Sequence, residues 1–122
     1  MEFAEKLSTA KLVSQDFRLT LTEAGKGDVV YCDPPYVPLS KTASFTAYAT
    51  GDFGPKDQTE LVASCLAATR RGATVLISNH DTPETRELYK DAKRIVSLLV
   101  QRMISCNGAE RNKAEELIAL FA

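Results

Sequence analysis

An apolar run, Val29–Cys32, is followed at once by an acid, two prolines and a tyrosine. Two consecutive prolines hold the backbone torsion φ near about −65° and remove two backbone donors, so the chain has to leave its strand here. A short continuous apolar run is typical of a strand that is buried on both faces of a sheet. The sequence therefore predicts a rigid polar turn at the carboxyl end of a strand, where α/β proteins usually bind ligands.

The rest of the chain alternates strand-like and helix-like segments, a pattern that predicts an α/β fold. We expect one short strand to end near residue 15 and four others to cover residues 28–32, 73–78, 94–105 and 115–121. Helices are expected over residues 18–24, 55–71 and 83–92. Periodicity alone leaves the last segment open between helix and strand. We favour a strand, because the preceding Asn107-Gly108 pair is a strong hairpin signal.

Composition indicates one globular domain of 122 residues, with 15 Lys and Arg against 16 Asp and Glu. A net charge of −1 offers no electrostatic footprint for nucleic acid, which argues against a complete, free-standing DNA-binding protein. Three cysteines without a C-x-x-C pair indicate reduced thiols and hence a cytoplasmic protein. We expect neither a secretory signal nor a membrane span.

Two other kinds of site are not expected from the sequence. His80 is the only histidine and no cysteine cluster accompanies it, so no metal site is predicted. Gly25 and Gly27 precede a strand instead of following one, and they lack the spacing of a phosphate-binding loop. The chain thus has no counterpart of the glycine-rich loop with which a doubly wound sheet binds its cofactor.

The turn itself suits the activation of an exocyclic or amide nitrogen. Such a nitrogen is a poor nucleophile because its lone pair is delocalised. Two acceptors that hold its hydrogens, the Asp33 carboxylate and the Pro34 carbonyl, can draw it toward a tetrahedral geometry. Pro35 fixes that carbonyl, and Tyr36 offers a flat face for stacking, which contributes roughly 1–3 kcal/mol per base. The alternative is that the Pro-Pro turn and its packed tyrosine have a purely structural role.

Several motifs of this chain together resemble the C-terminal part of the Dam-type DNA adenine methyltransferases. These are QDF, YCDPPYVPLS, SFTAY, VLISNHDT and ISCNGAERNKAEELIALF. The resemblance runs from about residue 10 to residue 121. It implies a partial Rossmann-like methyltransferase fold with a mixed, mostly parallel sheet, S-adenosylmethionine as cofactor, and methylation of a GATC-type site in double-stranded DNA at a flipped adenine.

The resemblance also assigns residues to the cofactor and to the target base. The catalytic group comprises Asp33, Pro34, Pro35 and Tyr36, which would grip the adenine, and Asp33 would also lie beside the cofactor. Asp16 would hydrogen-bond the adenine of the cofactor, and Phe17 would stack on it.

Two further segments are candidate contacts with the target. Ser40, Phe45 and Tyr48 belong to a long irregular segment that would close over the extruded base. Asn107 and Arg111 are candidate DNA contacts in the turn and loop of the predicted final hairpin. For Arg111 the alternative is an exposed, solvated hairpin tip.

The chain departs from the family's pattern in what it leaves out. We expect residues 1–122 to be the C-terminal part of a catalytic domain, without the glycine-rich cofactor loop or the target-recognition domain. Such a chain would be inactive alone, or would need a complementing N-terminal half, and its uncovered sheet would favour self-association. The alternatives are an RNA or protein-amide methyltransferase and a relic module without catalysis.

Overall fold

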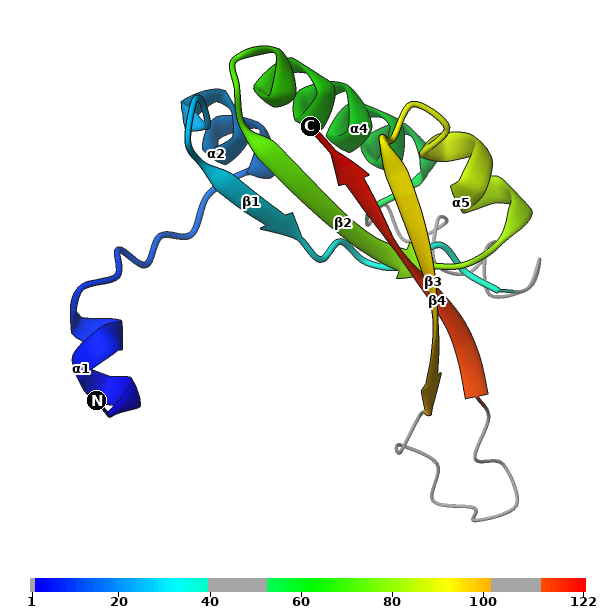
Figure 1. Ribbon diagram of the computed structural model, residues 1–122, viewed down its shortest axis with the longest axis horizontal. Coiled ribbons are helices and arrows are strands. Elements are labelled where there is room, and N and C mark those ends of the chain that lie inside the picture. The colour runs from blue at the N-terminus through cyan, green and yellow to red at the C-terminus, as the bar shows by residue number, and fades with distance from the viewer. Residues whose placement is uncertain (1, 40–52, 102–112) are drawn as a thin grey trace.

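The computed structural model describes residues 2–39, 53–101 and 113–122. They form a mixed four-stranded sheet in the order β1-β2-β4-β3, with bounds Val29–Cys32, Thr74–His80, Lys113–Phe121 and Arg94–Gln101. Helices α2 (Phe17–Glu23), α4 (Pro55–Arg70) and α5 (Pro83–Leu88) lie on one face of this sheet (Figure 1). The predicted α/β class is therefore confirmed.

Helix α4 begins and ends where its sequence predicts. Pro55 opens it, at a position where a missing backbone N–H costs no helical hydrogen bond. The Gly54 N–H donates to the Asp57 carboxylate at 2.9 Å and so caps the first turn. The chain leaves the helix through Gly72, whose φ of +99° favours glycine. One face of the helix supplies buried residues to the core: Gln58, Leu61, Val62, Cys65 and Ala68.

The pairing of the strands corrects one expectation. β1 runs parallel to β2, with Cys32 opposite Ile77, whereas β4 is antiparallel to both β2 and β3. The expectation of a mostly parallel sheet is therefore wrong for the described strands, since one of their three pairings is parallel. The C-terminal segment is a strand, as the hairpin signal indicated.

The core lies between the sheet and the helices. Val75, Ile77 and Phe121 point toward the helices and are at most 1% exposed. On the opposite face, Val29 is 71% exposed and Tyr31 is 59% exposed. The prediction that this strand is buried on both faces is wrong for the described chain, because β1 is an edge strand whose second face no described element covers.

Two segment predictions near the ends of helices also need correction. Residues 11–16 form no strand, because no described strand lies beside them to pair with, and Leu12 is 78% exposed. Helix α1 (Phe3–Ser8) precedes them and lies away from the sheet (Figure 1). Helix α5 ends at Leu88 instead of near residue 92, because Tyr89 leaves the helix and is fully buried. Among the described residues, no helix is long and apolar enough to cross a membrane.

Candidate active site

The acid of the turn is held by a chain of hydroxyl groups. The Tyr31 hydroxyl donates to Ser78 Oγ at 3.0 Å, and Ser78 Oγ donates to Asp33 Oδ1 at 3.0 Å. Ser78 lies on β2, opposite the end of β1, and is 4% exposed, whereas the Asp33 residue is exposed. One carboxylate oxygen is thereby oriented, and the other, Oδ2, accepts no hydrogen bond from any described residue.

The backbone of the turn is held by two amide side chains. Gln58 Nε2 on α4 donates to the Pro35 carbonyl at 2.7 Å. Asn79 Oδ1 on β2 accepts from the Val37 N–H at 2.9 Å. These two bonds lie on either side of Tyr36 in the sequence. Within the described ranges nothing donates to the Pro34 carbonyl, so this acceptor is open.

The Tyr36 ring packs against the ring of His80. Their centroids lie 4.8 Å apart with an interplanar angle of 78°, an edge-to-face arrangement. Burial raises the pKa of the Tyr36 phenol, and the nearby Ser78 hydroxyl acts in the opposite direction. Tyr36 is half-buried, so part of its surface remains available to a ligand.

A cavity of about 350 Å³ opens beside the turn. It brings together four of the predicted site residues with other side chains from α2 and α4 and with Phe53, which lies two residues before α4. The lining includes Phe17, Asp33, Pro34, Pro35, Phe53 and Leu61. Neither Asp16 nor Tyr36 belongs to the described lining, so the cavity joins the acid of the turn to Phe17 but not to every predicted residue.

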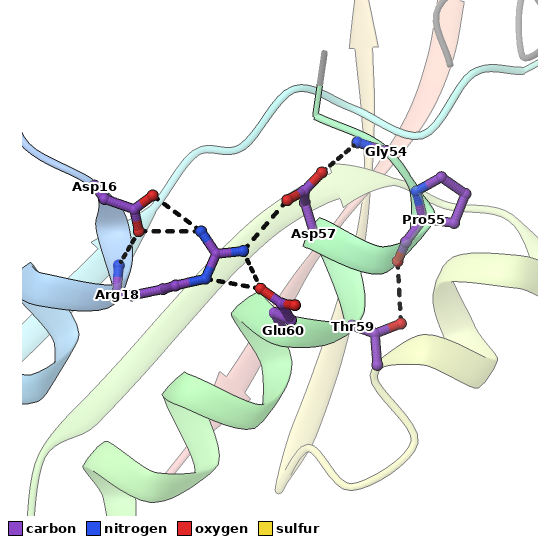
Figure 2. Close-up of polar contacts among 7 residues, drawn as sticks. All are labelled: Asp16, Arg18, Gly54, Pro55, Asp57, Thr59 and Glu60. Atoms are coloured by element: carbon purple, nitrogen blue, oxygen red, sulfur yellow. Dashed lines mark hydrogen bonds and ion pairs between the residues drawn. The ribbon is translucent and has the colours of Figure 1, made fainter. Parts of the chain in front are cut away.

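Asp16 is engaged in a cluster around Arg18, which Figure 2 shows. Asp16 caps α2 by accepting from the Arg18 N–H at 2.8 Å, and it also forms an ion pair with the Arg18 guanidinium at 2.9 Å. The same guanidinium pairs with Asp57 at 3.3 Å and with Glu60, both on α4. The backbone hydrogen bond from Arg18 is the main cause that lowers the pKa of Asp16.

The Arg18 cluster contacts the aromatic wall of the cavity, which is formed by Phe17 and Phe53. The Arg18 guanidinium carbon lies 4.4 Å from the centroid of the Phe17 ring. Phe17 in turn meets Phe53 edge to face, with centroids 5.7 Å apart. The ion pairs between α2 and α4 are thus linked, through Arg18, to two aromatic rings that line the cavity.

Five predicted contacts lie outside the described residues: Ser40, Phe45, Tyr48, Asn107 and Arg111. Within the described ranges, no group of three or more His, Cys, Asp or Glu side chains is arranged to hold a metal ion.

The family model for D12 class N6 adenine-specific DNA methyltransferases matches residues 1–104. The chain belongs to this family. It is 48% identical over 120 residues to the DNA adenine methylase of Vibrio cholerae serotype O1. It is 46% identical over 119 residues to that of Escherichia coli K12 and 48% identical over 121 residues to that of Serratia marcescens. The resemblance read from the motifs is confirmed.

These alignments cover 98% of the chain but only 43%, 42% and 44% of the three relatives, in the same order. This D12-class chain therefore spans less than half the length of the curated relatives it matches. The activity of a whole protein is consequently a proposal, which we develop below.

Sequence reasoning missed the role of Gln58 in this D12-class site. A signal was present, because this polar residue shares the buried face of α4 with Leu61, Val62 and Cys65. Ser78, Asn79 and His80 are the last three residues of β2. Each of the three contacts the turn, Ser78 through Asp33, Asn79 through Val37 and His80 through Tyr36.

Proposed function

We propose that the protein to which this chain belongs transfers a methyl group from S-adenosylmethionine to the exocyclic amine of adenine in a GATC-type DNA site. The observation that carries this proposal is the state of Asp33, which lines the cavity with one carboxylate oxygen held by Ser78 and the other open. The open Pro34 carbonyl lies beside it in the chain. Membership of the adenine-specific family supports adenine as the base.

The chemistry follows from these two acceptors. Asp33 Oδ2 and the Pro34 carbonyl each accept one hydrogen of the amine, so its lone pair is withdrawn from the ring and directed toward the electrophile. Once the new carbon–nitrogen bond forms, the nitrogen carries an extra proton, and the Asp33 carboxylate is placed to accept it. Tyr36 stacks on the base, which has left the duplex to reach the turn.

The described residues fit part of a site for the cofactor. Phe17 and Phe53 form an aromatic wall suited to a flat purine ring, and Gln15 adds an amide to the lining. S-adenosylmethionine, when bound, supplies an electrophilic methyl group, whose transfer needs alignment above all. To hydrogen-bond the cofactor, Asp16 would have to give up part of its contact with Arg18. We therefore propose that stacking on Phe17 is the main contact of the cofactor's adenine.

The other predicted contacts extend this proposal to DNA. Ser40, Phe45 and Tyr48 would close over the flipped base, and Asn107 and Arg111 would contact the duplex. They remain predictions that the family membership supports.

One face of the sheet is covered by no described element, and this supports a requirement for a further part of the protein. Val29, Tyr31, Val96 and Leu98 expose between 40% and 71% of their surface there. A sheet of an α/β protein usually has both faces covered. We infer that this face packs against an N-terminal part like that of the longer relatives, or against a second copy of the chain.

Complementation tests both inferences. The chain would be assayed alone and mixed with the N-terminal part of the Escherichia coli relative, using labelled S-adenosylmethionine and a GATC duplex. We expect transfer in the mixture and none by the chain alone, with cofactor binding too weak for calorimetry at micromolar concentration.

Light scattering on the chain alone separates self-association from a monomer. Efficient transfer to structured RNA instead of the duplex would favour the alternative substrate.

The role of Asp33 is tested by Asp33→Asn in the active mixture, because the amide keeps the volume but removes the charge. We expect kcat to fall by at least about 100-fold. Asp91→Asn is the matched control, since Asp91 is exposed and precedes β3, and it should keep the wild-type rate. A full-rate Asp33→Asn mixture would contradict the assignment.

A further inference from the structure

We propose that Gln58 and Asn79 form a buried amide clamp that positions the Asp33–Tyr36 turn for methyl transfer, an inference that rests on the proposed function. The two side chains come from α4 and β2 and are 3% and 0% exposed. Neither belongs to the described lining of the cavity, and both form hydrogen bonds with the backbone of the turn. They are positioning residues.

The turn needs such a clamp because its own backbone is not fastened. Pro34 and Pro35 carry no N–H, and the pairing of β1 with β2 ends at Cys32 and Ile77. Residues 34–37 form no backbone–backbone hydrogen bond with the described chain. Side chains must therefore fix the position of this backbone.

The clamp holds the peptide groups on both sides of Tyr36. Gln58 Nε2 holds the Pro35 carbonyl at 2.7 Å, and Asn79 Oδ1 holds the Val37 N–H at 2.9 Å. With these two points fixed, the Pro34 carbonyl cannot swing away from Asp33 without breaking a buried hydrogen bond. The clamp thus sets the relative position of the two acceptors on which the proposed chemistry depends.

The orientation of the Asn79 amide is locked by its other partners. Its Oδ1 also accepts from the His80 N–H at 2.8 Å, and its Nδ2 donates to the buried Tyr89 hydroxyl at 3.0 Å. If the amide were flipped, its NH₂ group would face two backbone donors, Val37 and His80. The acceptor is therefore held toward the turn by the core itself.

Gln58 shows that the clamp is maintained at a cost. Its Oε1 is buried and has no hydrogen-bond partner among the described residues. An unsatisfied buried polar atom destabilises a fold, so an apolar side chain would suit this face of α4 better. The hydrogen bond from Nε2 to the Pro35 carbonyl gives this polar side chain a function at that position.

The first test uses hydrogen exchange in the 122-residue chain, with the Val37 amide as reporter and the Ile77 amide in β2 as internal reference. Asn79→Ala removes the acceptor, whereas Asn79→Asp retains one. We expect the ratio of Val37 to Ile77 exchange rates to rise at least about tenfold in Asn79→Ala and to return toward wild type in Asn79→Asp. An unchanged ratio in Asn79→Ala would overturn the clamp.

The second test measures methyl transfer in the mixture with the Escherichia coli N-terminal part. Gln58→Met keeps the length of the side chain but removes the donor, and we expect kcat to fall about 10- to 100-fold with KM for S-adenosylmethionine unchanged within about twofold. Lys56→Met, an exposed change in the same helix, should keep both values.

The outcomes separate the two proposals. If the wild-type mixture shows no transfer, the proposed function fails and the catalytic purpose of the clamp fails with it, whereas the exchange ratio still decides whether the clamp exists. If the wild-type mixture is active and Gln58→Met retains its kcat, the positioning role is overturned.

Discussion

The Asp33–Tyr36 turn and the Arg18 cluster both adjoin one cavity, the turn through Asp33 and the cluster through its contact with Phe17, and they are held by opposite means. The turn is fastened by neutral amides that are almost completely buried, Gln58 and Asn79. The cluster is fastened by ion pairs around Arg18, whose side chain is 41% exposed. Buried hydrogen bonds are insensitive to salt and leave unsatisfied groups when broken, whereas exposed ion pairs are screened and individually weak.

This difference suits the two walls to different tasks. The two acceptors beside the amine need a fixed separation, because small displacements of a reacting group are costly. The aromatic wall of Phe17 and Phe53 only has to provide a flat surface, and the ion pairs behind it can rearrange when a ligand enters. The comparison yields three predictions, in order of decreasing effect.

The largest effect is expected for Asn79→Ala in the 122-residue chain. The change leaves the Tyr89 hydroxyl and two backbone N–H groups buried without their partner. We expect the free energy of unfolding to fall by about 2–4 kcal/mol, measured by urea denaturation. A loss below about 1 kcal/mol would show that the buried amides contribute no more to stability than the exposed ion pairs of the Arg18 cluster.

The pH dependence provides an intermediate effect. Burial raises the pKa of the Tyr89 phenol from its ordinary value of 10 to about 12. A raised pKa means that the folded state holds the proton more tightly, so this stabilisation is complete below pH 10 and is lost as pH rises toward 12.

We therefore expect the free energy of unfolding to fall by about 2 kcal/mol between pH 10 and pH 12 because of the Tyr89 phenol. Tyr89→Phe has no phenol to ionise, so its stability should vary less across the same range. Equal slopes for the two proteins would contradict the assignment to Tyr89.

The smallest effect is expected for Arg18→Met. The variant removes three ion pairs but retains an apolar contact with Phe17, so the melting temperature should fall by at most about 3 °C in low salt. In 1 M NaCl the difference from wild type should disappear, because screening has already weakened the pairs. A large fall in melting temperature that persists in high salt would mean that the Arg18 cluster, like the buried amide clamp, is insensitive to screening.

The sequence predicts the elements that carry strong local signals. The Pro-Pro turn, the start of α4 at Pro55 and its end at Gly72 follow from backbone restrictions that act within a few residues. The site residues Phe17, Asp33, Pro34 and Pro35 were named from motifs and do meet at one cavity.

The parts that could not be predicted depend on contacts between distant segments. The bond from Gln58 to the Pro35 carbonyl joins α4 to the turn, and no local pattern specifies that partner. The segment around Leu12 and Val13 favours a strand by composition, yet a strand forms only where a neighbour supplies hydrogen bonds. The exposure of Tyr31 likewise depends on which elements cover its face of the sheet, and no described element does so.

The order of the strands has a consequence for how the molecule assembles. β3 and β4 are consecutive strands, whereas β1 pairs with β2 only after the chain has closed a long loop through α4. Closing a longer loop loses more chain entropy, so the C-terminal ribbon can nucleate while β1 is still unattached. We therefore expect the Asp33–Tyr36 turn to dock after the ribbon of β3 and β4 has formed.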